Sequence, residues 1–417
     1  MAPTLGIIAD DYTGALMVAS YLEGAGIPCP VVFDPSAVAG DAPVVIAGTR
    51  TRTVAVQEAL AELETFVNAF AQAGCTRFAY KACASFDSTS EGNIGPAADF
   101  LAERTGVRPV LMAAGFPLFN ITVHQGYLFY RGRLVSESIK RLDPLTPMSD
   151  PDLVRFLSLQ TKERIGLVNH SVLRKGAAAV AKAVDELSAQ GNGHIFFDAS
   201  DDDDIATAAS FAATRNCAVA ASDPFLISYA RHFVADKVAG RAAPRHAGGP
   251  AAVLAGTVGP VILEQLETFR TEFPVLSLDL LDPRSEEAVV ADAVQWAEPL
   301  VGRKPFAIST ATDATGVERA QSAFGPLGAA RRAERLLGGI ARGLRERGIR
   351  RFVVAGGETS GSVVSALEVR AVRAFPEGAL GTGFCVTEEA DPISFYLKPG
   401  KLGGDDILLR ALEFMNC

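Results

Sequence analysis

Short runs of consecutive apolar residues alternate along the chain with longer stretches in which apolar positions recur every three or four residues. Runs of this kind are typical of strands buried on both faces, and the longer repeats are typical of amphipathic helices. One helix is predicted from Val56 to Phe70, and Gly74 would end it. The runs predict strands at residues 5–9, 44–48, 78–83, 110–115, 165–169, 195–199 and 218–222, then at 251–255, 306–310, 352–355 and 394–397.

This alternation predicts an α/β protein of two domains, each a mostly parallel sheet flanked by helices. The stretch 240–250 is rich in proline, glycine, alanine and arginine. It shows no periodic pattern of apolar residues, so we interpret it as a linker. We expect one domain over residues 1–240 and a second over 250–417, with the active site in the interdomain cleft. A chain of 417 residues is long enough for two separate cores.

Composition narrows the range of partners. The chain has 39 Lys and Arg against 48 Asp and Glu, a net charge of −9, which disfavours binding to nucleic acid or to an anionic membrane. The first apolar run is shorter than a signal peptide needs and is predicted to be a strand. Six cysteines are scattered without metal-ligand spacing, which favours free thiols and a cytoplasmic location.

Polar segments follow several predicted strands of the first half, where ligands of open α/β sheets bind. Asp10 and Asp11 follow the first strand, and helix capping explains only one of these two adjacent acids. Lys81 precedes a hydroxyl-rich loop at residues 85–96 that leads into a helix. A lysine, hydroxyl groups and free helix amides together suit a carboxylate or phosphate group, although a polar turn is an equal alternative.

Other polar residues of this half have plainer interpretations. His124 and His170 each lie near a strand end, but a single histidine is more often structural than catalytic. The acidic block at residues 201–204 is interpreted as a solvated turn.

Glycine-rich turns mark the second half. They lie at residues 256–259, 355–361 and 398–406, between predicted strands and helices. Glycines allow close approach of a ligand, and free amides at a helix start favour phosphate. The turns match neither a P-loop nor a dinucleotide fingerprint. Three of the nine lysines, Lys81, Lys398 and Lys401, lie in these candidate segments.

This division of polar groups suits phosphoryl transfer, with one domain holding an acceptor alcohol and the other a nucleotide. A binding protein that senses an acid sugar without ATP is an alternative. An NAD-dependent dehydrogenase is a weaker one, because the chain lacks the GxGxxG pattern.

At these segments the chain resembles the four-carbon acid sugar kinases. The resemblance is carried in order by IADDYTGA (8–15), KACASFDSTSEGNIGP (81–96), HQGYLF (124–129), PMSD (147–150), AGGETSG (355–361) and PGKLGGDD (399–406). It implies an acid-sugar-binding domain, a nucleotide-binding domain, and ATP-dependent phosphorylation of a 4-hydroxyl with Mg²⁺. Phe86 favours the 3-oxo-tetronate branch over the D-threonate and D-erythronate kinases.

The resemblance also implies site residues. Those expected to bind the sugar are Asp10, Asp11, Lys81, Asp87, Ser88, Thr89 and Asn93. Those expected to bind ATP are Thr257, Gly356, Gly357, Glu358, Thr359, Ser360, Gly361, Gly400, Gly403 and Gly404. The catalytic base would be Asp11 or Asp405, and the metal ligands are left open. Thr257-Val258-Gly259 stands where the family has Ser-Cys-Ser. The partners would be the acid sugar and ATP, and the sequence leaves open a homodimer.

Overall fold

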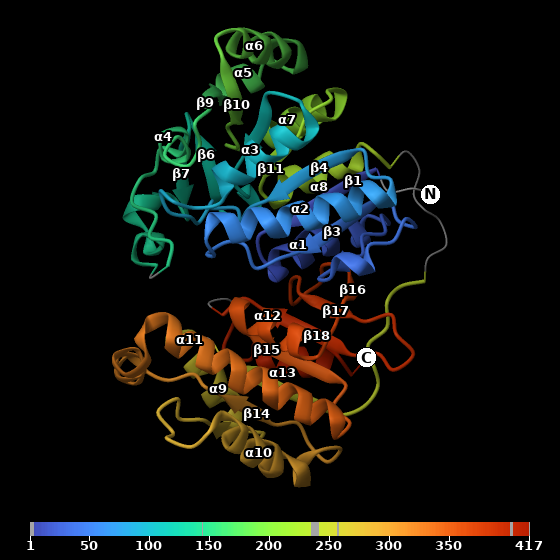
Figure 1. The fold of residues 1–417 in the computed structure, drawn as a ribbon, viewed down its shortest axis with the longest axis vertical. Helices are drawn as coiled ribbons and strands as arrows, with labels where there is room; N and C mark the ends of the chain where they lie inside the picture. Colours follow the sequence, from blue (N-terminus) through green and yellow to red (C-terminus); the bar gives the residue numbers. More distant parts are fainter. Residues whose placement is uncertain (1–3, 144, 235–241, 257, 401–402, 417) are drawn as a thin grey trace. The chain divides into compact units, whose positions relative to one another are not determined.

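The structure, a computed structural model, describes residues 4–143, 145–234, 242–256, 258–400 and 403–416. The chain forms two compact units, Met1–Arg241 (unit 1) and Ala242–Cys417 (unit 2). Figure 1 shows each as a sheet with helices packed on it. Within the described residues, no helix is both long enough and apolar enough to cross a bilayer.

Unit 1 is built on an eight-stranded parallel sheet in the order β2-β3-β1-β4-β11-β5-β10-β9. Because all strands run the same way, their carboxyl ends share one edge. The strands are β1 (Leu5–Ala9), β2 (Val31–Val32), β3 (Val44–Gly48), β4 (Arg77–Lys81), β5 (Val110–Ala113), β9 (Arg164–Val168), β10 (Asn192–Phe197) and β11 (Val219–Ala221).

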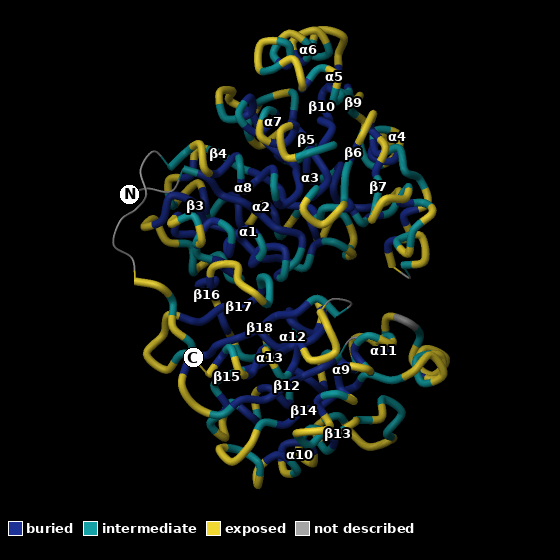
Figure 2. Tube along the Cα trace, turned by 180° about the vertical axis from the view of Figure 1, so that it is seen from behind, coloured by how far each residue is buried: buried dark blue, intermediate teal, exposed yellow. Residues whose placement is uncertain are grey.

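Five helices of unit 1 form two packed groups: α1 and α7 pack against α8, and α2 packs against α3. The helices of unit 1 are α1 (Tyr12–Gly24), α2 (Val56–Ala73), α3 (Ile94–Thr105), α4 (Leu153–Leu157), α5 (His170–Leu173), α6 (Ala177–Ala189), α7 (Asp202–Thr214) and α8 (Asp223–Arg231). The strands between these groups are mostly buried (Figure 2), as their continuous apolar sequence requires.

A small antiparallel sheet, β6-β7-β8, interrupts this pattern after β5. Its strands are β6 (Ile121–His124), β7 (Tyr127–Tyr130) and β8 (Arg133–Leu134), and short 3₁₀ turns flank them at Pro117–Phe119, Val135–Glu137 and Ile139–Leu142. The sheet is joined to the end of β10, because Val123 and Ala199 exchange two backbone hydrogen bonds of 3.0 Å. The sequence analysis did not predict these strands.

Unit 2 has a sheet in the order β13-β14-β12-β15-β18-β17-β16, parallel through β18 and antiparallel at β17 and β16. Helices α10, α11 and α12 pack together, as do α9 and α13. The elements are β12 (Ala251–Ala255), α9 (Pro260–Arg270), β13 (Val275–Ser277), α10 (Glu286–Ala297), β14 (Ala307–Ser309), α11 (Ala314–Glu346), β15 (Arg351–Ala355), α12 (Gly357–Ala366), β16 (Ala371–Ala374), β17 (Phe384–Val386), β18 (Ser394–Lys398) and α13 (Ile407–Phe414).

The predicted fold class is therefore confirmed: two α/β units, each with a mostly parallel sheet flanked by helices. The predicted strands at 5–9, 44–48 and 251–255 have the observed bounds. Helix α2 ends at Gly74, whose φ of 101° is left-handed and suits a residue without a Cβ. The expected active site in the interdomain cleft stays a prediction.

Candidate functional site

Asp10 and Asp11 lie at the carboxyl end of β1, where they share one arginine. Arg52, from the loop after β3, donates from Nε and Nη2 to the two carboxylate oxygens of Asp10, at 2.8 and 3.0 Å. Its Nη2 also lies 2.5 Å from Oδ2 of Asp11. Oδ1 of Asp11 accepts from the amide of Gly14 and caps α1, as the sequence suggested for one of the two acids.

Lys81 joins the same cluster from the end of β4. Its Nζ lies 3.2 Å from Oδ1 of Asp223, the first residue of α8, and its side chain is only 2% exposed. A Cβ on Gly14 would lie 2.1 Å from Nζ of Lys81 and 2.6 Å from Oδ1 of Asp11. Gly14 is therefore required for the lysine and the aspartate to approach the start of α1.

The charges of this cluster fix its protonation. Burial opposes ionisation of Asp11, but Arg52 and Lys81 outweigh it and hold the pKa of Asp11 below its usual value. Burial likewise disfavours the charged form of Lys81, yet Asp223 and the two aspartates raise its pKa. Asp11 is about a quarter exposed whereas Asp10 is buried, so Asp11 is the more accessible carboxylate of the pair.

Asp87 forms a second charged group in the loop after β4. Its carboxylate accepts from Oγ of Ser85 at 2.7 Å and from Nζ of Lys140 at 2.5 Å. The thiol of Cys83 accepts from the amide of Asp87 at 3.2 Å. Burial and the nearby Asp87 raise the pKa of Cys83 to about 12, so the thiol stays protonated.

Other predicted sugar-binding residues of this loop make internal contacts. Ser88 is buried, and its Oγ accepts from Nε2 of Gln160, which also donates to the carbonyl of Thr89. Asn93 is buried and donates to the carbonyls of Thr51 and Val54, at 2.6 and 2.9 Å. Asn93 thus fastens the loop that carries Arg52.

Sequence reasoning missed four residues of this site. Arg52 and Asp223 lie in the segments that leave strands β3 and β11, so the strand-end rule that found Asp10 could have found them. Lys140 lies in the 3₁₀ turn Ile139–Leu142 and Gln160 in a turn after α4, both far along the chain from Asp87 and Ser88. No local pattern marks them, because only the tertiary fold brings them to the loop.

The glycine turns of unit 2 meet at the carboxyl ends of three adjacent strands. Ala255 of β12 pairs with Ala355 of β15, and Ala355 pairs with Lys398 of β18. A Cβ on Gly256 would lie 2.3 Å from Oγ1 of Thr359 in α12, so the first turn packs directly against the start of this helix. The structure therefore brings the predicted turns 256–259 and 355–361 together.

Helix α12 begins with groups suited to an anion. Its N-cap is Gly356, with φ of 124°, which has no side chain to cap the amides of the first turn. Gly357 and Glu358 are exposed, whereas Thr359, Ser360 and Gly361 are buried. Oγ of Ser360 donates to the carbonyl of Gly356 at 2.7 Å, which rigidifies the turn.

The third turn follows β18. Lys398 is 1% exposed and donates to the carbonyls of Pro399 and Gly400, and burial lowers its pKa to about 8. Gln265 of α9 donates to the carbonyls of Gly403 and Gly404, both at 3.2 Å. Asp405 is exposed. Thr257 and Lys401, both singled out from the sequence, lie outside the described residues.

These residues fit a nucleotide with a bound metal ion. The amides at the start of α12 and the close approach allowed by Gly256 suit phosphate oxygens. Mg²⁺ is usually held by phosphates with one or two carboxylates and water, so it needs no protein cage. Glu358 and Asp405 are exposed acids at these turns and could supply such a carboxylate.

Comparison with known proteins also divides the chain into an N-terminal and a C-terminal part. Residues 5–229 match the family described as sugar-binding N-terminal domain, and residues 252–408 match that described as nucleotide-binding C-terminal domain. The chain is 35% identical to a 3-oxo-tetronate kinase of Methylobacterium radiotolerans, over all of both chains. It is 36% identical to a 3-oxo-tetronate kinase of Pseudomonas fluorescens, over 98% of this chain and 96% of the relative.

Two solved structures share the fold. A crystal structure of a proposed tRNA synthase from Salmonella typhimurium LT2 matches with a TM-score of 0.83 and 29% identity, covering 98% of each chain. A Haemophilus influenzae protein matches with a TM-score of 0.76 and 28% identity, over 98% of this chain and all of that chain. With the full-length identity to curated kinases, these findings show that the chain belongs to the four-carbon acid sugar kinase family.

Proposed function

We propose that this kinase transfers the γ-phosphoryl group of ATP to the 4-hydroxyl of 3-oxo-tetronate. The observation that carries the proposal is the charged cluster of Asp10, Asp11, Arg52 and Lys81 at the strand edge of unit 1. It lies in the part of the chain that matches a sugar-binding domain, and the curated relatives reported above are named for this substrate. D-Threonate and D-erythronate are the alternative acceptors.

The exposed cations of the site are suited to the substrate carboxylate. Arg52 and Lys140 keep 24% and 21% of their side chains exposed, whereas Lys81 is nearly inaccessible behind Asp223. We assign recognition of the carboxylate to Arg52 or Lys140 and hydroxyl contacts to Asp11 and Asp87. Lys81 then serves to keep Asp11 ionised, and Asn93 positions Arg52 through its loop.

The nucleotide is assigned to unit 2. Amides at the start of α12 would hold phosphate oxygens, while Gly256 leaves room for them and Thr359 lines the same turn. Mg²⁺, when bound, would neutralise charge that develops on the phosphates. The remaining glycines of the turn after β18, Gly400, Gly403 and Gly404, are proposed as further nucleotide contacts.

A carboxylate must accept the proton of the 4-hydroxyl as the new oxygen–phosphorus bond forms and the bond to ADP breaks. The lowered pKa of Asp11 keeps it ionised but makes it a weak base. Comparing Asp11→Asn with Asp405→Asn identifies the base. The base variant loses roughly 10²- to 10⁴-fold in kcat while ATP binding persists, and the other variant retains activity within about tenfold.

The test of the function is a kinase assay over a panel of acid sugars. The full chain is incubated with ATP, Mg²⁺ and each of 3-oxo-tetronate, threonate and erythronate, in both stereochemical series. ADP release is followed by a coupled assay, and the 4-phosphate product by ³¹P NMR. We expect the highest kcat/KM with 3-oxo-tetronate and no turnover after chelation of Mg²⁺. Absence of turnover with every member of the panel would refute the proposal.

We also propose a cytoplasmic location. Cys29, Cys75, Cys83, Cys217 and Cys385 are free thiols, and four of these five are buried. Free thiols of this kind suit a reducing compartment. Light scattering of the purified chain would measure whether it forms the homodimer that the sequence left open.

A further inference from the structure

We propose that His124 and His170 bind a divalent transition-metal ion such as Zn²⁺ at a second site in unit 1. His170 follows β9, and His124 ends β6. Between β9 and β4, the strand that carries Lys81, lie β10, β5 and β11. Four strand spacings amount to roughly 19 Å, so the strand end that carries His170 is separate from the strand end that carries Lys81.

Hydrogen bonds fix the tautomer of both imidazoles. Oγ of Ser200 donates to the carbonyl of Val123 at 3.1 Å, so it accepts from Nδ1–H of His124 at 3.0 Å. Nδ1 of His170 lies 3.0 and 2.9 Å from the two oxygens of the Asp204 carboxylate, which can only accept. When the ring is neutral, each imidazole therefore presents the lone pair of Nε2. No hydrogen bond joins either Nε2 atom to another described residue.

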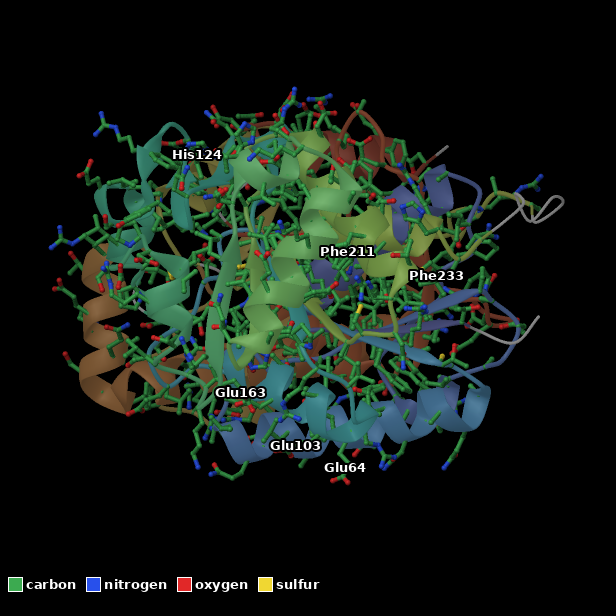
Figure 3. All side chains as sticks on the ribbon, turned by 90° about the horizontal axis from the view of Figure 1, so that it is seen from above. Glu64, Glu103, His124, Glu163, Phe211 and Phe233 are labelled. Atoms are coloured by element: carbon green, nitrogen blue, oxygen red, sulfur yellow. The ribbon has the colours of Figure 1, made fainter. Side chains whose placement is uncertain are left out.

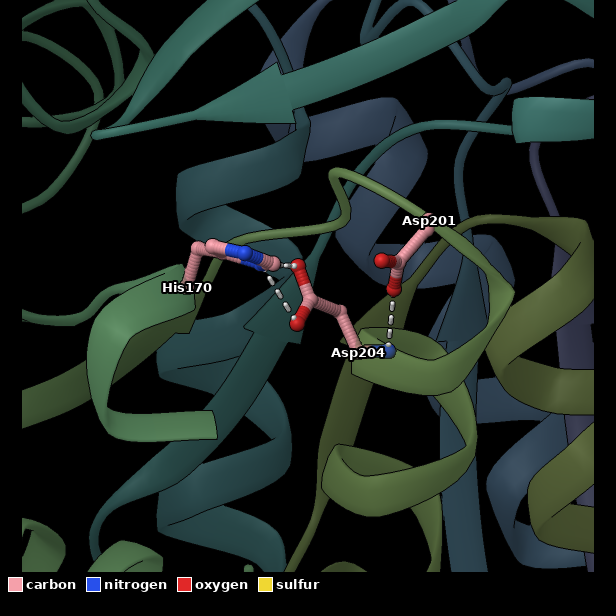
Figure 4. A group of neighbouring side chains, drawn as sticks. All are labelled: His170, Asp201 and Asp204. Carbon is pink, nitrogen blue, oxygen red and sulfur yellow. Dashed lines mark hydrogen bonds and ion pairs between the residues drawn. The ribbon is translucent and has the colours of Figure 1, made fainter. Parts of the chain in front are cut away.

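This arrangement is that of metal-binding histidines. Such histidines usually donate their other ring nitrogen to a carboxylate or another acceptor, which sets the tautomer and orients the ring. Asp204 plays this part for His170, as Figure 4 shows, and its side chain is fully buried. Ser200 plays it for His124, whose exposed side chain is labelled in Figure 3.

The spacing of the two rings suits one shared ion. Their centroids lie 5.5 Å apart, with an angle of 53° between the planes. Two imidazoles that bind one zinc ion through nitrogens about 2.0–2.1 Å from the metal have centroids about 5–6 Å apart. The centroid spacing is therefore the one that a shared ion requires.

A buried carboxylate holds both histidine-bearing segments in place. Asp198, at the end of β10, accepts from the amides of Gln125, Gly126 and His170, each at 2.8 Å. Two of these amides belong to the turn after His124, and the third is that of His170 itself. The site is thus largely preorganised, which lowers the cost of binding.

The surrounding charges favour a cation over an anion. Asp198, Asp201 and Asp204 lie beside His170, while Arg174 donates to Asp203 at 3.0 Å.

Ligand atoms of His170, Asp201 and Asp204 lie within 4.8 Å of one another and form a rival set of metal ligands. We assign Asp204 and Asp201 an orienting role instead of a metal-binding one. Asp204 accepts from Nδ1 of His170, and Asp201 accepts from the amide of Asp204 at 2.9 Å. Imidazole ligands suit Zn²⁺, Cu²⁺ and Ni²⁺.

Calorimetry with Zn²⁺ on the tag-free full chain, after removal of chelator, tests this site. We expect one ion per chain, with affinity at least tenfold weaker in His124→Ala and in His170→Ala. Asp204→Asn should weaken binding by about 10- to 100-fold, as loss of an orienting group does. His232→Ala, which changes an exposed histidine elsewhere in unit 1, serves as the matched control and should bind Zn²⁺ as the wild type does.

Absence of stoichiometric binding, or unchanged affinity in His124→Ala, would overturn the proposal. Weakening by His170→Ala and Asp201→Asn alone would assign the ion to the rival set and also overturn it. Electron paramagnetic resonance of the Cu²⁺-loaded wild type needs no variant to fold. It should show nitrogen couplings from two imidazoles, and coupling from one or none contradicts the pair.

Discussion

The guanidinium group of Arg52 binds both oxygens of the Asp10 carboxylate, at 2.8 and 3.0 Å, from a loop 42 residues further along the chain. The same group reaches Asp11. One arginine therefore sets the position of both acids that follow β1. A planar guanidinium can make these contacts together, whereas an ammonium group cannot.

Replacing Arg52 by lysine should impair sugar turnover. Arg52→Lys keeps the positive charge but loses the paired hydrogen bonds to Asp10. Loss of one charge-assisted bond, worth about 1.5–3 kcal/mol, should lower kcat/KM for the acid sugar roughly 10- to 150-fold. KM for ATP should not change. Steady-state kinetics with each substrate varied in turn measures kcat/KM for the acid sugar and KM for ATP. Arg104→Lys, on the surface of α3, is the control. An unchanged kcat/KM in Arg52→Lys would show that Arg52 is not part of the sugar site.

Lys140 should contribute to sugar binding through Asp87. Burial opposes the charge of Lys140, yet the adjacent Asp87 raises the pKa of Lys140, so its ammonium group stays charged. Lys140→Met leaves the partly buried Asp87 without its cation, and we expect KM for the acid sugar to rise about tenfold, the equivalent of about 1.4 kcal/mol. Lys182→Met, on the exposed face of α6, is the matched control. Equal kinetics in both variants would contradict a role for Lys140.

Gly256 should be indispensable for nucleotide binding. The methyl group in Gly256→Ala would meet Oγ1 of Thr359 at 2.3 Å and Cδ1 of Leu337 at 2.8 Å, and so push the turn after β12 from the start of α12. Overpacking of this kind costs about 1–3 kcal/mol. We expect the upward thermal shift with Mg-ATP to disappear.

Gly378→Ala is the control for this prediction, because nothing lies within 4 Å of a Cβ at that position. It should retain the full shift with Mg-ATP. A normal shift in Gly256→Ala would show that this turn lies away from the nucleotide.

His246 should make unit 2 sensitive to acid. Its ring stacks on Phe375 with centroids 4.0 Å apart, and both ring nitrogens are buried without a hydrogen bond to any described residue. Burial, and then Arg351, lower its pKa to about 4, below the value of about 6.5 in an unfolded chain. The unfolded state therefore binds more protons in this window, so the stabilisation present above pH 6.5 is lost as the pH falls towards 4.

Thermal melts between pH 7 and pH 4 test this effect against His246→Phe, which fills the same aromatic site without a titrating group. Over this range the Tm of the wild type should fall further than that of the variant, by at least about 2–4 °C, the shift expected for about 1 kcal/mol in a domain of this size. His232→Gln, at an exposed histidine, should follow the wild type. Parallel pH profiles of wild type and His246→Phe would refute the prediction.

The sequence predicted most of the parallel strands, because burial on both faces demands a continuous apolar run, but it missed β2 and β13 and the strands β16 and β17. It did not predict the β6–β7–β8 sheet. Its turns are Gln125-Gly126 and Arg131-Gly132, with φ between 53° and 80° at all four positions. Such turns favour Asn-Gly or Asp-Gly, so glutamine and arginine at the first position gave no hairpin signal.

The acidic block at 201–204 was interpreted as a solvated turn, but Asp201 caps α7 and the other three residues form the first turn of that helix. Asp202 and Asp203 are exposed, but Asp204 is buried against His170. A helix places residues of one charged run on different faces, so neighbours in sequence can have opposite environments. The sequence showed the charges, and the packing of α7 decided which of them faces the interior.

Local sequence by itself determined which segments form strands and helices and which strand ends carry acids, glycines and hydroxyl groups. Those properties depend on side chains close together in the chain. Only the tertiary structure decided that Arg52 binds Asp10, that Lys140 binds Asp87, and that Gly256 packs against Thr359. These pairs join residues from separate crossovers, and their meeting depends on the order of strands in each sheet, which no local pattern encodes.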